Sequence, residues 1–514
     1  MKRFISLLLV IIIITSLVAC AVEPADTTAE PVVSTPTAET PDGSPTETHA
    51  ETPEETPEET PEETPEETPE ETPEETPEET PEETPPETDP VDVGIPAPDG
   101  ETLPLPTIAA GHKSRVTDMG DGSRLVIISG VTSEYHLEYC DQLTAVGYEK
   151  KAAHSVANDT NLASVYLSES HVATLFYAET ASEMRIALDS RDATGYDEYL
   201  ELPHSKIDRV CEPLLLFVGN NNPAGDKNNG LCVIVRLSSG EFIIFDGGWN
   251  DESAPKDQTA TRIRKLIKEY APDPNNVTIA AWLITHAHTD HIGGLEFYVD
   301  NYLLDTSVTL KNILINMPSD GQLLEAYPKR LEELKTKMDK YRQMLQRAEE
   351  SGTLVHKTHA GQKLTFGDAT LEVLFTFDLL SPQKLSSFND LSIVSRLTVE
   401  GQTLMVTGDT QTASNKKMEA LYGESMHADF FTVPHHGWGK NTNTFVKVVK
   451  PLWVLWPSLA GKGQYMPELS YHSFLWSQDS SLLADPFIAN FKTYVFTLPF
   501  DGKTYTVVDN SEIK

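Results

Sequence analysis

The fold of this chain is decided by residues 285–294, which read THAHTDHIGG. They follow an almost wholly apolar run at residues 277–284, which predicts a buried strand. Side chains alternate along a strand, so two of the histidines can project the same way at its end, while the next polar residues come from the turn into a helix. Imidazole nitrogen and carboxylate oxygen suit zinc, and also manganese or iron. We therefore predict a metal site formed by His286, His288, Asp290 and His291.

Three further polar motifs stand directly after predicted strands. Asp246 follows the strand-like run 241–245 and precedes two glycines. Asp409 follows the run 404–407 and one glycine, and a pair of histidines at 435 and 436 follows the run 429–433. Each motif is short, but their order along the chain is informative.

In that order, the motifs resemble those of the metallo-β-lactamase superfamily over about residues 212–510. The resemblance implies an α/β fold, a four-layer αββα sandwich with the site in loops at one edge of two sheets. It also implies two divalent metal ions, with zinc expected first and manganese or iron as alternatives. The implied ligands, supported from outside by Asp246, are His286, His288, Asp290, His291, His436 and a bridging Asp409.

Within the superfamily, the chain looks most like ComEC-like hydrolases and surface phosphorylcholine esterases. The likeness is carried by NDLS at 389–392, TGD at 407–409 and VPHHG at 433–437. On this branch the implied activity is hydrolysis of a phosphodiester or other phosphoester by a metal-bridged hydroxide, with nuclease activity as one version. The implied substrate is a small-molecule, nucleotide or cell-surface phosphodiester.

Two other functions stay open. One is hydrolysis of a different ester, a lactone or a lactam. The other is a surface-binding lipoprotein whose hydrolase domain is inactive, although the complete set of motifs argues against it.

The chain departs from the superfamily pattern at one point. Many members have a further histidine between the first cluster and the bridging aspartate. His356 and His359 are candidates, but neither follows the end of a predicted strand. Asn389 and Asp390 stand nearer the expected place, and we expect them to support the site from outside the ligand set.

The two neighbouring histidines call for a choice. Adjacent residues on an extended segment point in opposite directions, so both are not expected to bind the same metal. We expect His436 to be the ligand and His435 to face the substrate. His435 and Asp290 are accordingly the predicted catalytic residues. Trp438 and Lys440 could lie at the pocket rim, and His472 could approach the metals.

The N-terminus predicts an anchor. A charged start is followed by an apolar run at residues 4–18 and by Ala19-Cys20. The pattern has the shape of a signal peptide, residues 1–20, and resembles the bacterial lipoprotein lipobox. Cys20 would then be the lipidated first residue, holding the protein on the extracellular face of the cell membrane. The alternative is an ordinary signal peptide cut after Ala19.

Residues 21–106 are predicted to be a disordered acidic stalk. ETPE units repeat from 51 to 82, and their prolines and carboxylates oppose helix and core formation. The formal net charge of the chain is −40, but residues 21–100 hold 27 acidic and no basic side chains, which leaves −15 for residues 101–514. No stable nucleic-acid complex is expected, because the folded part lacks a basic balance.

The folded part is expected to contain two domains. Residues 107–205 read as a small α+β domain without a chemical constellation, and residues 212–514 as the hydrolase domain. In the first, a helix at 133–146 is predicted to bury Leu137, Cys140 and Leu143. In the second, the apolar stripe of a long helix at 328–350 is expected to pack on the domain's own sheet, with a coiled coil as the alternative.

Overall fold

A computed structural model describes residues 91–193, 195, 209–219, 230–249, 259–437, 443–457, 487–489, 492–510 and 513. Cys20, the ETPE repeat, Trp438, Lys440 and His472 lie outside the described residues. Among the helices that the structure describes, none combines the length and the apolar character needed to cross a membrane.

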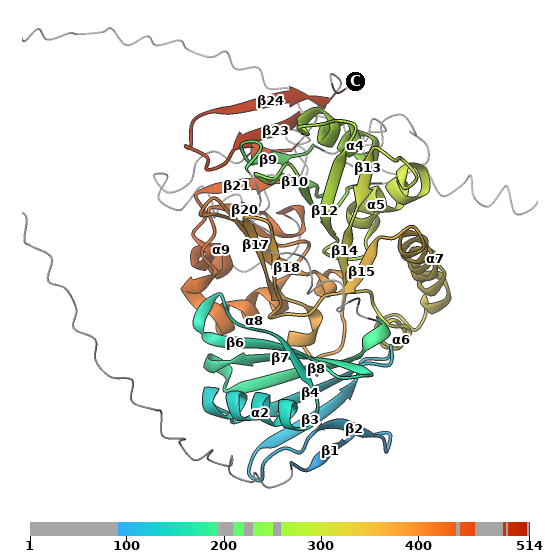
Figure 1. The fold of residues 1–514 in the computed structure, drawn as a ribbon, viewed down its shortest axis with the longest axis vertical. Helices are drawn as coiled ribbons and strands as arrows, with labels where there is room; N and C mark the ends of the chain where they lie inside the picture. The colour runs from blue at the N-terminus through green and yellow to red at the C-terminus, as the bar shows by residue number, and fades with distance from the viewer. Residues whose placement is uncertain are drawn as a thin grey trace, which may run out of the picture. The chain divides into compact units, whose positions relative to one another are not determined.

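Two sheets form the centre of the predicted hydrolase domain (Figure 1). The first has the order β15-β14-β12-β11-β10-β9-β23-β24, with β13 paired to β12. Its strands are β9 (Leu214–Phe217), β10 (Val233–Arg236), β11 (Phe242–Phe245), β12 (Val277–Leu283), β13 (Val308–Leu310), β14 (Asn312–Ile315), β15 (Leu354–Lys357), β23 (Lys492–Thr497) and β24 (Tyr505–Asp509). β11, β12, β14 and β15 run parallel to one another.

The second sheet has the order β16-β17-β18-β19-β20-β21-β22. Its strands are β16 (Lys363–Phe366), β17 (Ala369–Phe375), β18 (Val394–Val399), β19 (Gln402–Val406), β20 (Phe430–Thr432), β21 (Trp453–Trp456) and β22 (Phe487–Ile488). β19, β20 and β21 are parallel, so their carboxyl ends meet at one edge.

Helices cover the outer face of each sheet. Figure 1 shows α4 (Thr259–Tyr270), α5 (Thr289–Tyr302) and α7 (Leu331–Glu350) beside the first sheet, and α8 (Thr412–Tyr422) and α9 (Asn443–Val449) beside the second. A short α6 (Asp320–Ala326) precedes α7, and the 3₁₀ turns of this domain are η3 (Phe377–Leu379), η4 (Phe388–Leu391), η5 (Gly423–Met426) and η6 (Pro434–Gly437). The predicted four-layer αββα sandwich is confirmed.

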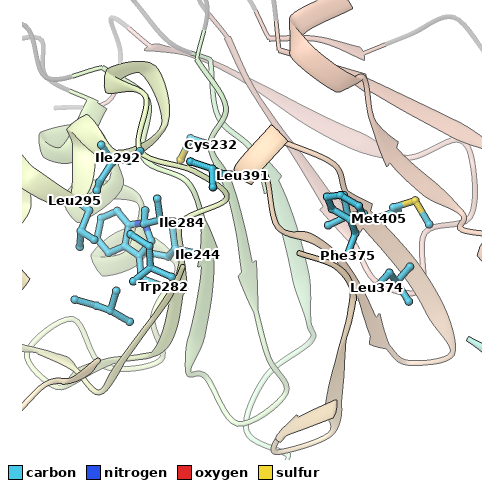
Figure 2. Close-up of a cluster of buried hydrophobic side chains, with 14 of the residues drawn as sticks. Cys232, Ile244, Trp282, Ile284, Ile292, Leu295, Leu374, Phe375, Leu391 and Met405 are labelled. Atoms are coloured by element: carbon cyan, nitrogen blue, oxygen red, sulfur yellow. The ribbon is translucent and has the colours of Figure 1, made fainter. Parts of the chain in front are cut away.

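Alternation along the strands builds the layers. Leu283 of β12 lies in the core between the two sheets, together with Val406 of β19. Its neighbour Trp282 belongs to the core beneath the helices. Figure 2 shows this second core, where Trp282 lies near Ile292 and Leu295 of α5. Burial on both faces explains why the parallel strands are nearly continuous apolar runs.

The long helix α7 packs as predicted on its own domain. Its buried stripe, which joins the core beneath the helices, consists of Leu334, Met338, Tyr341, Met344, Leu345 and Ala348. The apolar stripe is therefore buried against the helix's own domain and does not need a coiled-coil partner to cover it.

The N-terminal part is an antiparallel sheet with the order β3-β4-β8-β7-β6-β5. Its strands are β3 (Lys113–Asp118), β4 (Arg124–Ser129), β5 (Glu149–Val156), β6 (Asn158–Leu167), β7 (His171–Ala178) and β8 (Glu183–Ser190). Helix α2 (Ser133–Ala145) covers one face, and η1 (Glu179–Ala181) and η2 (Arg191–Ala193) are short 3₁₀ turns. The opposite face contributes Phe176 and Val172 to the two cores of the hydrolase domain. The sheet is thus packed onto the hydrolase domain.

Two expectations for this part were wrong. The stalk was expected to reach residue 106, but β1 (Val93–Pro96) and β2 (Thr102–Pro106) form a hairpin. Leu103 and Leu105 of this hairpin are buried with α2, so the short apolar alternation there belongs to the core. Leu137 of α2 is 56% exposed, because the buried face of the helix runs through His136, Cys140 and Leu143 instead.

Candidate metal centre

The carboxyl ends of β11 and β12 bring the first group of polar residues together. The two strands are parallel neighbours, with Phe245 opposite Leu283. Asp246 therefore stands beside Thr285, whose backbone N–H and hydroxyl both donate to its carboxylate, at 2.7 and 2.8 Å. Helix α5 begins immediately afterwards, with His288 in the N-cap position and Asp290 in the first turn.

Two glycines of the motifs permit this close packing. A Cβ on Gly294 of α5 would lie 2.0 Å from the carbonyl oxygen of Gly247, so the helix can rest directly on the turn after β11. A Cβ on Gly408 would lie 2.8 Å from the Cβ of Thr285. Gly408 also has a φ of +54°, which glycine adopts without steric cost. The turn after β19 can therefore approach the end of β12 and deliver Asp409.

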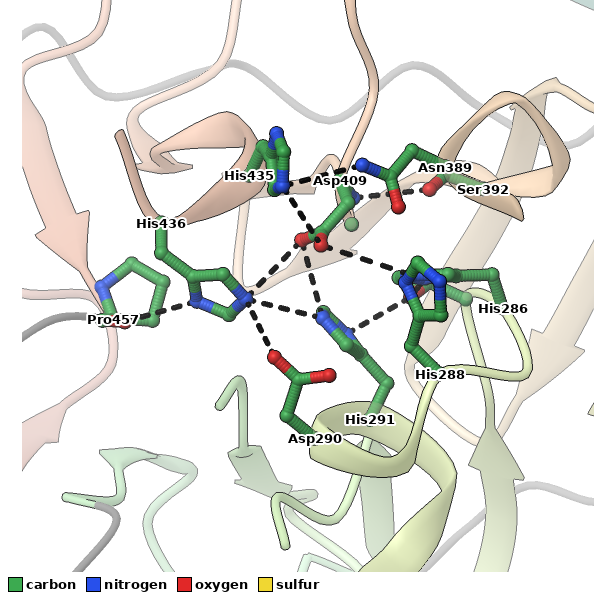
Figure 3. A network of polar contacts seen from close by, with 12 residues as sticks. His286, His288, Asp290, His291, Asn389, Ser392, Asp409, His435, His436 and Pro457 are labelled. Carbon is green, nitrogen blue, oxygen red and sulfur yellow. Dashed lines mark hydrogen bonds and ion pairs between the residues drawn. The ribbon is translucent and has the colours of Figure 1, made fainter. Parts of the chain in front are cut away.

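Six side chains converge in two groups, which share the region around the Asp409 carboxylate (Figure 3). The first group is His286, His288 and Asp409, and the second is Asp290, His291 and His436. Within each group, one potential ligand atom per residue lies within 4.8 Å of the others.

Distances in the first group are short between nitrogens. His286 Nε2 lies 2.8 Å from His288 Nδ1 and 3.7 Å from Asp409 Oδ2. Phe388 packs against the His288 ring with centroids 5.5 Å apart, and Tyr327 stacks on Phe388 at the same spacing. This aromatic pair restricts the position of His288.

In the second group, His436 Nε2 lies 3.2 Å from His291 Nε2 and 3.3 Å from Asp290 Oδ2. Asp409 Oδ1 lies 3.1 Å from His291 Nε2 and 3.3 Å from His436 Nε2. Asp409 is therefore the residue whose two oxygens face the two groups separately.

The donor set fits two divalent cations. Asp409 Oδ1 is fully buried and has no hydrogen bond of good geometry from the described residues, although two imidazole nitrogens lie near it. A buried carboxylate oxygen without a partner is costly unless a charge meets it. Four imidazoles and two carboxylates that face one another are the nitrogen and oxygen donors preferred by zinc, manganese and iron.

The pKa values of the histidines are shifted in opposite directions in the two groups. Burial lowers the pKa of His288 to about 4 and holds the pKa of His286 well below its ordinary value. Burial acts in the same direction on His291 and His436, but the carboxylates beside them outweigh it and raise the pKa of both. The carboxylates beside His291 and His436 therefore favour positive charge in the second group, whereas burial dominates in the first.

Outer contacts fix two of the candidate ligands. His291 Nδ1 donates to Asp246 Oδ2 at 2.7 Å, and His436 Nδ1 donates to the carbonyl oxygen of Pro457 at 3.0 Å. Each contact leaves Nε2 facing the cluster. Such contacts set the tautomer and ring orientation of metal-binding histidines. Pro457 carries no local sequence signal, since it follows β21 and reaches His436 through the sheet.

The histidine pair is arranged differently from the expectation. His435 and His436 both have positive φ, 51° and 52°, so the segment is a turn and the argument from an extended backbone was wrong. His436 lies in the second group. Figure 3 shows His435 toward Asn389, with its Nε2 3.2 Å from Asn389 Nδ2 and 3.8 Å from Asp409 Oδ2. His435 thus lies at the edge of the centre and is partly accessible.

Asp390 does not contact the candidate ligands. Its carboxylate accepts hydrogen bonds from the backbone N–H groups of Ser386 and Ser387, at 2.9 and 3.0 Å, and closes the turn that carries Asn389. Asp390 therefore supports the centre only through the turn that carries Asn389, because capping of η4 uses its Oδ2 atom. Asn389 contacts His435.

The two alternative histidines lie elsewhere. His356 Nε2 lies 2.9 Å from Asn312 Oδ1. His359 is held between Asp378 Oδ2 at 2.6 Å and Asp189 Oδ2 at 2.8 Å, and so joins the N-terminal sheet to the hydrolase domain. Neither histidine belongs to the two candidate ligand groups.

Sequence reasoning missed Lys337. This residue of α7 donates a 2.8 Å hydrogen bond to the hydroxyl of Thr289, which stands between His288 and Asp290. A signal was present, because Lys337 lies three residues after Leu334 and four before Tyr341, and so stands on the same face of the helix as these two buried residues. A lysine on such a stripe needs an explanation.

Comparison with known proteins agrees with this geometry. The family model described as Metallo-beta-lactamase superfamily matches residues 225–451. No curated protein matches the chain. Residues 225–451, which hold every member of the two ligand groups, thus match the metallo-beta-lactamase superfamily.

Solved structures are similar only distantly. The metallo-beta-lactamase fold protein YhfI from Bacillus subtilis has a TM-score of 0.30 and 15% identity, over 55% of this chain and 97% of that chain. The diiron beta-hydroxylase CmlA from Streptomyces venezuelae has a TM-score of 0.28 and 14% identity, over 48% of this chain and 44% of that chain. Zn(2+)-bound PqqB from Methylobacterium extorquens has a TM-score of 0.25 and 10% identity, over 43% and 72%. The chain thus spans less than half the length of CmlA.

Proposed function

We propose that this protein is a phosphoesterase whose main substrates are phosphodiesters. Each of the two ligand groups would hold one divalent cation. The observation that carries the proposal is the position of Asp409, with Oδ2 3.7 Å from His286 Nε2 and Oδ1 3.1 Å from His291 Nε2. One carboxylate between two sets of imidazoles is suited to hold a pair of cations.

The ligands divide accordingly. His286 and His288 would hold one cation, and Asp290, His291 and His436 the other, with Asp409 shared between them. Zinc is the expected metal, and manganese or iron are the alternatives. When bound, such cations act as Lewis acids on the scissile group and provide a nucleophile near neutral pH.

Residues of the chain would complete the reaction. His435 lies beside the ligands and is partly accessible, so its ring can donate a hydrogen bond or a proton to the leaving oxygen. Asn389 orients that ring through its side-chain amide. Asp290, at the other edge of the centre, has a carboxylate 18% exposed and can hold a proton of the attacking water.

The preference for phosphodiesters is supported by the NDLS, TGD and VPHHG motifs at residues 389–392, 407–409 and 433–437. Fold alone says little about substrate. The test is turnover of bis(p-nitrophenyl) phosphate by protein of known metal content, alongside p-nitrophenyl acetate, a lactone and a chromogenic β-lactam. Turnover of the phosphodiester is expected. Hydrolysis of a carboxylic ester, lactone or lactam alone would contradict the proposal, and so would metal-free, inactive protein.

We also propose that the protein acts on the extracellular face of the cell membrane, anchored by lipid at Cys20. The support is the charged start, the apolar run at 4–18 and the Ala19-Cys20 junction. The Cys20→Ser variant is expected to leave the membrane fraction or to persist as uncleaved precursor. Normal processing and unchanged membrane partition of that variant would contradict the anchor.

A further inference from the structure

Lys337 brings a positive charge to the edge of the metal centre. It projects from α7, outside the loops that supply the ligands, and its Nζ donates to Thr289 Oγ1 at 2.8 Å. The same ammonium lies 5.7 Å from the centroid of the Tyr341 ring. Its charge acts on Asp290 and on His288, the two residues that flank Thr289.

Within the described part of the chain, this charge has no close counter-ion. No carboxylate of the described residues lies within 4.0 Å of Lys337 Nζ. Other basic residues of α7 differ: Lys335 pairs with Asp320 at 2.9 Å, and Lys340 pairs with Glu296 at 2.6 Å. Lys337 is therefore distinguished from its neighbours on the same helix.

A partly buried ammonium without a counter-ion is unfavourable. Burial lowers the pKa of Lys337 from its ordinary value, and the nearest acidic groups do not restore it. Leu334, Met338 and Tyr341 form the buried stripe of α7, and the ammonium of Lys337 is held beside it by two uncharged groups, the Thr289 hydroxyl and the Tyr341 ring. A site for an anion explains why a lysine stands there.

The proposed function requires such a site. A phosphodiester carries one negative charge on its non-bridging oxygens, whereas a carboxylic ester or a lactone is neutral. We propose that Lys337 binds a non-bridging oxygen of the substrate and so makes the centre selective for anionic esters. This inference rests on the proposed phosphoesterase function and names Lys337 as a residue that determines its substrate specificity.

The test compares Lys337→Met and Lys337→Arg with the control Lys335→Met, which removes a half-exposed lysine from the same helix. Metal-loaded enzymes are assayed for kcat and KM with bis(p-nitrophenyl) phosphate and with neutral p-nitrophenyl acetate. Loss of a charged hydrogen bond should raise KM for the phosphodiester about 10- to 100-fold in Lys337→Met. Lys337→Arg should be affected less, and the values for the neutral ester and for Lys335→Met should stay as in wild type.

Two further measurements separate this role from a structural one. Metal content and melting temperature of Lys337→Met should not fall, because the change removes an uncompensated charge. Inorganic phosphate, compared with chloride at equal ionic strength, should raise the melting temperature of metal-loaded wild type and not that of Lys337→Met. Equal losses with both substrates, an unchanged KM for the phosphodiester, or equal phosphate stabilisation of both proteins would overturn the inference. Failure of wild type to hydrolyse any phosphoester would instead overturn the proposed function, and the phosphate measurement would still decide whether Lys337 binds an anion.

Discussion

Asp246 and His291 are 45 residues apart in sequence, yet the carboxylate of the first accepts a 2.7 Å hydrogen bond from Nδ1 of the second. Both side chains are fully buried. Asp246 is itself fixed by the backbone N–H and the hydroxyl of Thr285. The orientation of a candidate ligand is thus determined by the end of the neighbouring strand.

The Asp246→Asn variant should test this support. Asparagine tolerates the positive φ of 54° at this position, so folding should be retained. The amide can no longer accept from His291 and Thr285 as a carboxylate does, and loss of such support typically lowers metal affinity by about 10- to 100-fold. Competition with a chromophoric chelator measures the affinity. Unchanged affinity with normal circular dichroism would show that His291 needs no outer partner.

Asp409 should have the largest effect on metal content. Because its oxygens face both ligand groups, Asp409→Ala is expected to remove both metals or to hold them too loosely for catalysis. His286→Ala should chiefly empty the first group, and Asp290→Ala the second. All three should lower phosphodiester hydrolysis by orders of magnitude while circular dichroism stays normal. Elemental analysis gives the metal stoichiometry, and full metal content with full activity in Asp409→Ala would refute the dinuclear assignment.

Three of the predicted ligands share one property, which is their position directly after a strand. His286, Asp409 and His436 follow short apolar strands, and strand ends can be predicted because alternation and turn residues are local signals. Parallel pairing of β11 with β12 and of β19 with β20 then gathers those ends. For this reason the cluster from His286 to His291 could be predicted from the residues alone, whereas the four-layer fold and the ligand roles of Asp409 and His436 were implied by the resemblance of the motifs to the metallo-β-lactamase superfamily.

What sequence could not provide depends on packing between distant elements. Pro457 reaches His436 because β20 and β21 pair in parallel, and Lys337 reaches Thr289 because α7 lies along α5. The turn at His435 and His436 was predicted as extended, since non-glycine residues rarely adopt positive φ without a tertiary reason. Local patterns carry none of these relationships.

His359 should make stability depend on pH. Burial opposes its protonation, but Asp189 and Asp378 on either side raise its pKa to about 10. A group whose pKa rises on folding stabilises the folded state below its unfolded pKa, near 6.5, and loses this contribution as pH rises through about 10. The wild-type advantage over His359→Asn in free energy of unfolding should be on the order of 3–5 kcal/mol at pH 6 and should decline toward pH 10.

Urea unfolding of both proteins at pH 6, 8 and 10 measures this difference, with metal content held constant. The matched control is His171→Asn, because His171 is partly exposed and contacts Ser170 at the start of β7. A difference between wild type and His359→Asn that does not change with pH would mean that the imidazolium of His359 does not join the two parts.

The boundary of the folded part gives the last prediction. Ile95, Leu103 and Leu105 of the β1–β2 hairpin are buried, and Tyr139 of α2 donates a 2.9 Å hydrogen bond to the carbonyl oxygen of Pro106. A chain that begins at residue 86 should unfold at the same temperature as the full chain and hydrolyse soluble substrate equally well. A chain that begins at residue 107 should lose on the order of 5 kcal/mol, because three buried apolar side chains no longer cover α2.

Differential scanning calorimetry of the two shortened chains measures the loss. If the chain that begins at residue 107 does not fold, the double substitution Leu103→Ala and Leu105→Ala in the full chain tests the same contact, and it should lower the melting temperature without changing metal content. The hairpin lies on the α2 face of the N-terminal sheet, opposite the face that joins the hydrolase cores, so kcat at moderate temperature should be retained. Equal melting temperatures for chains beginning at residues 86 and 107 would mean that the hairpin adds nothing to the core, and that residue 106 is the true end of the stalk after all.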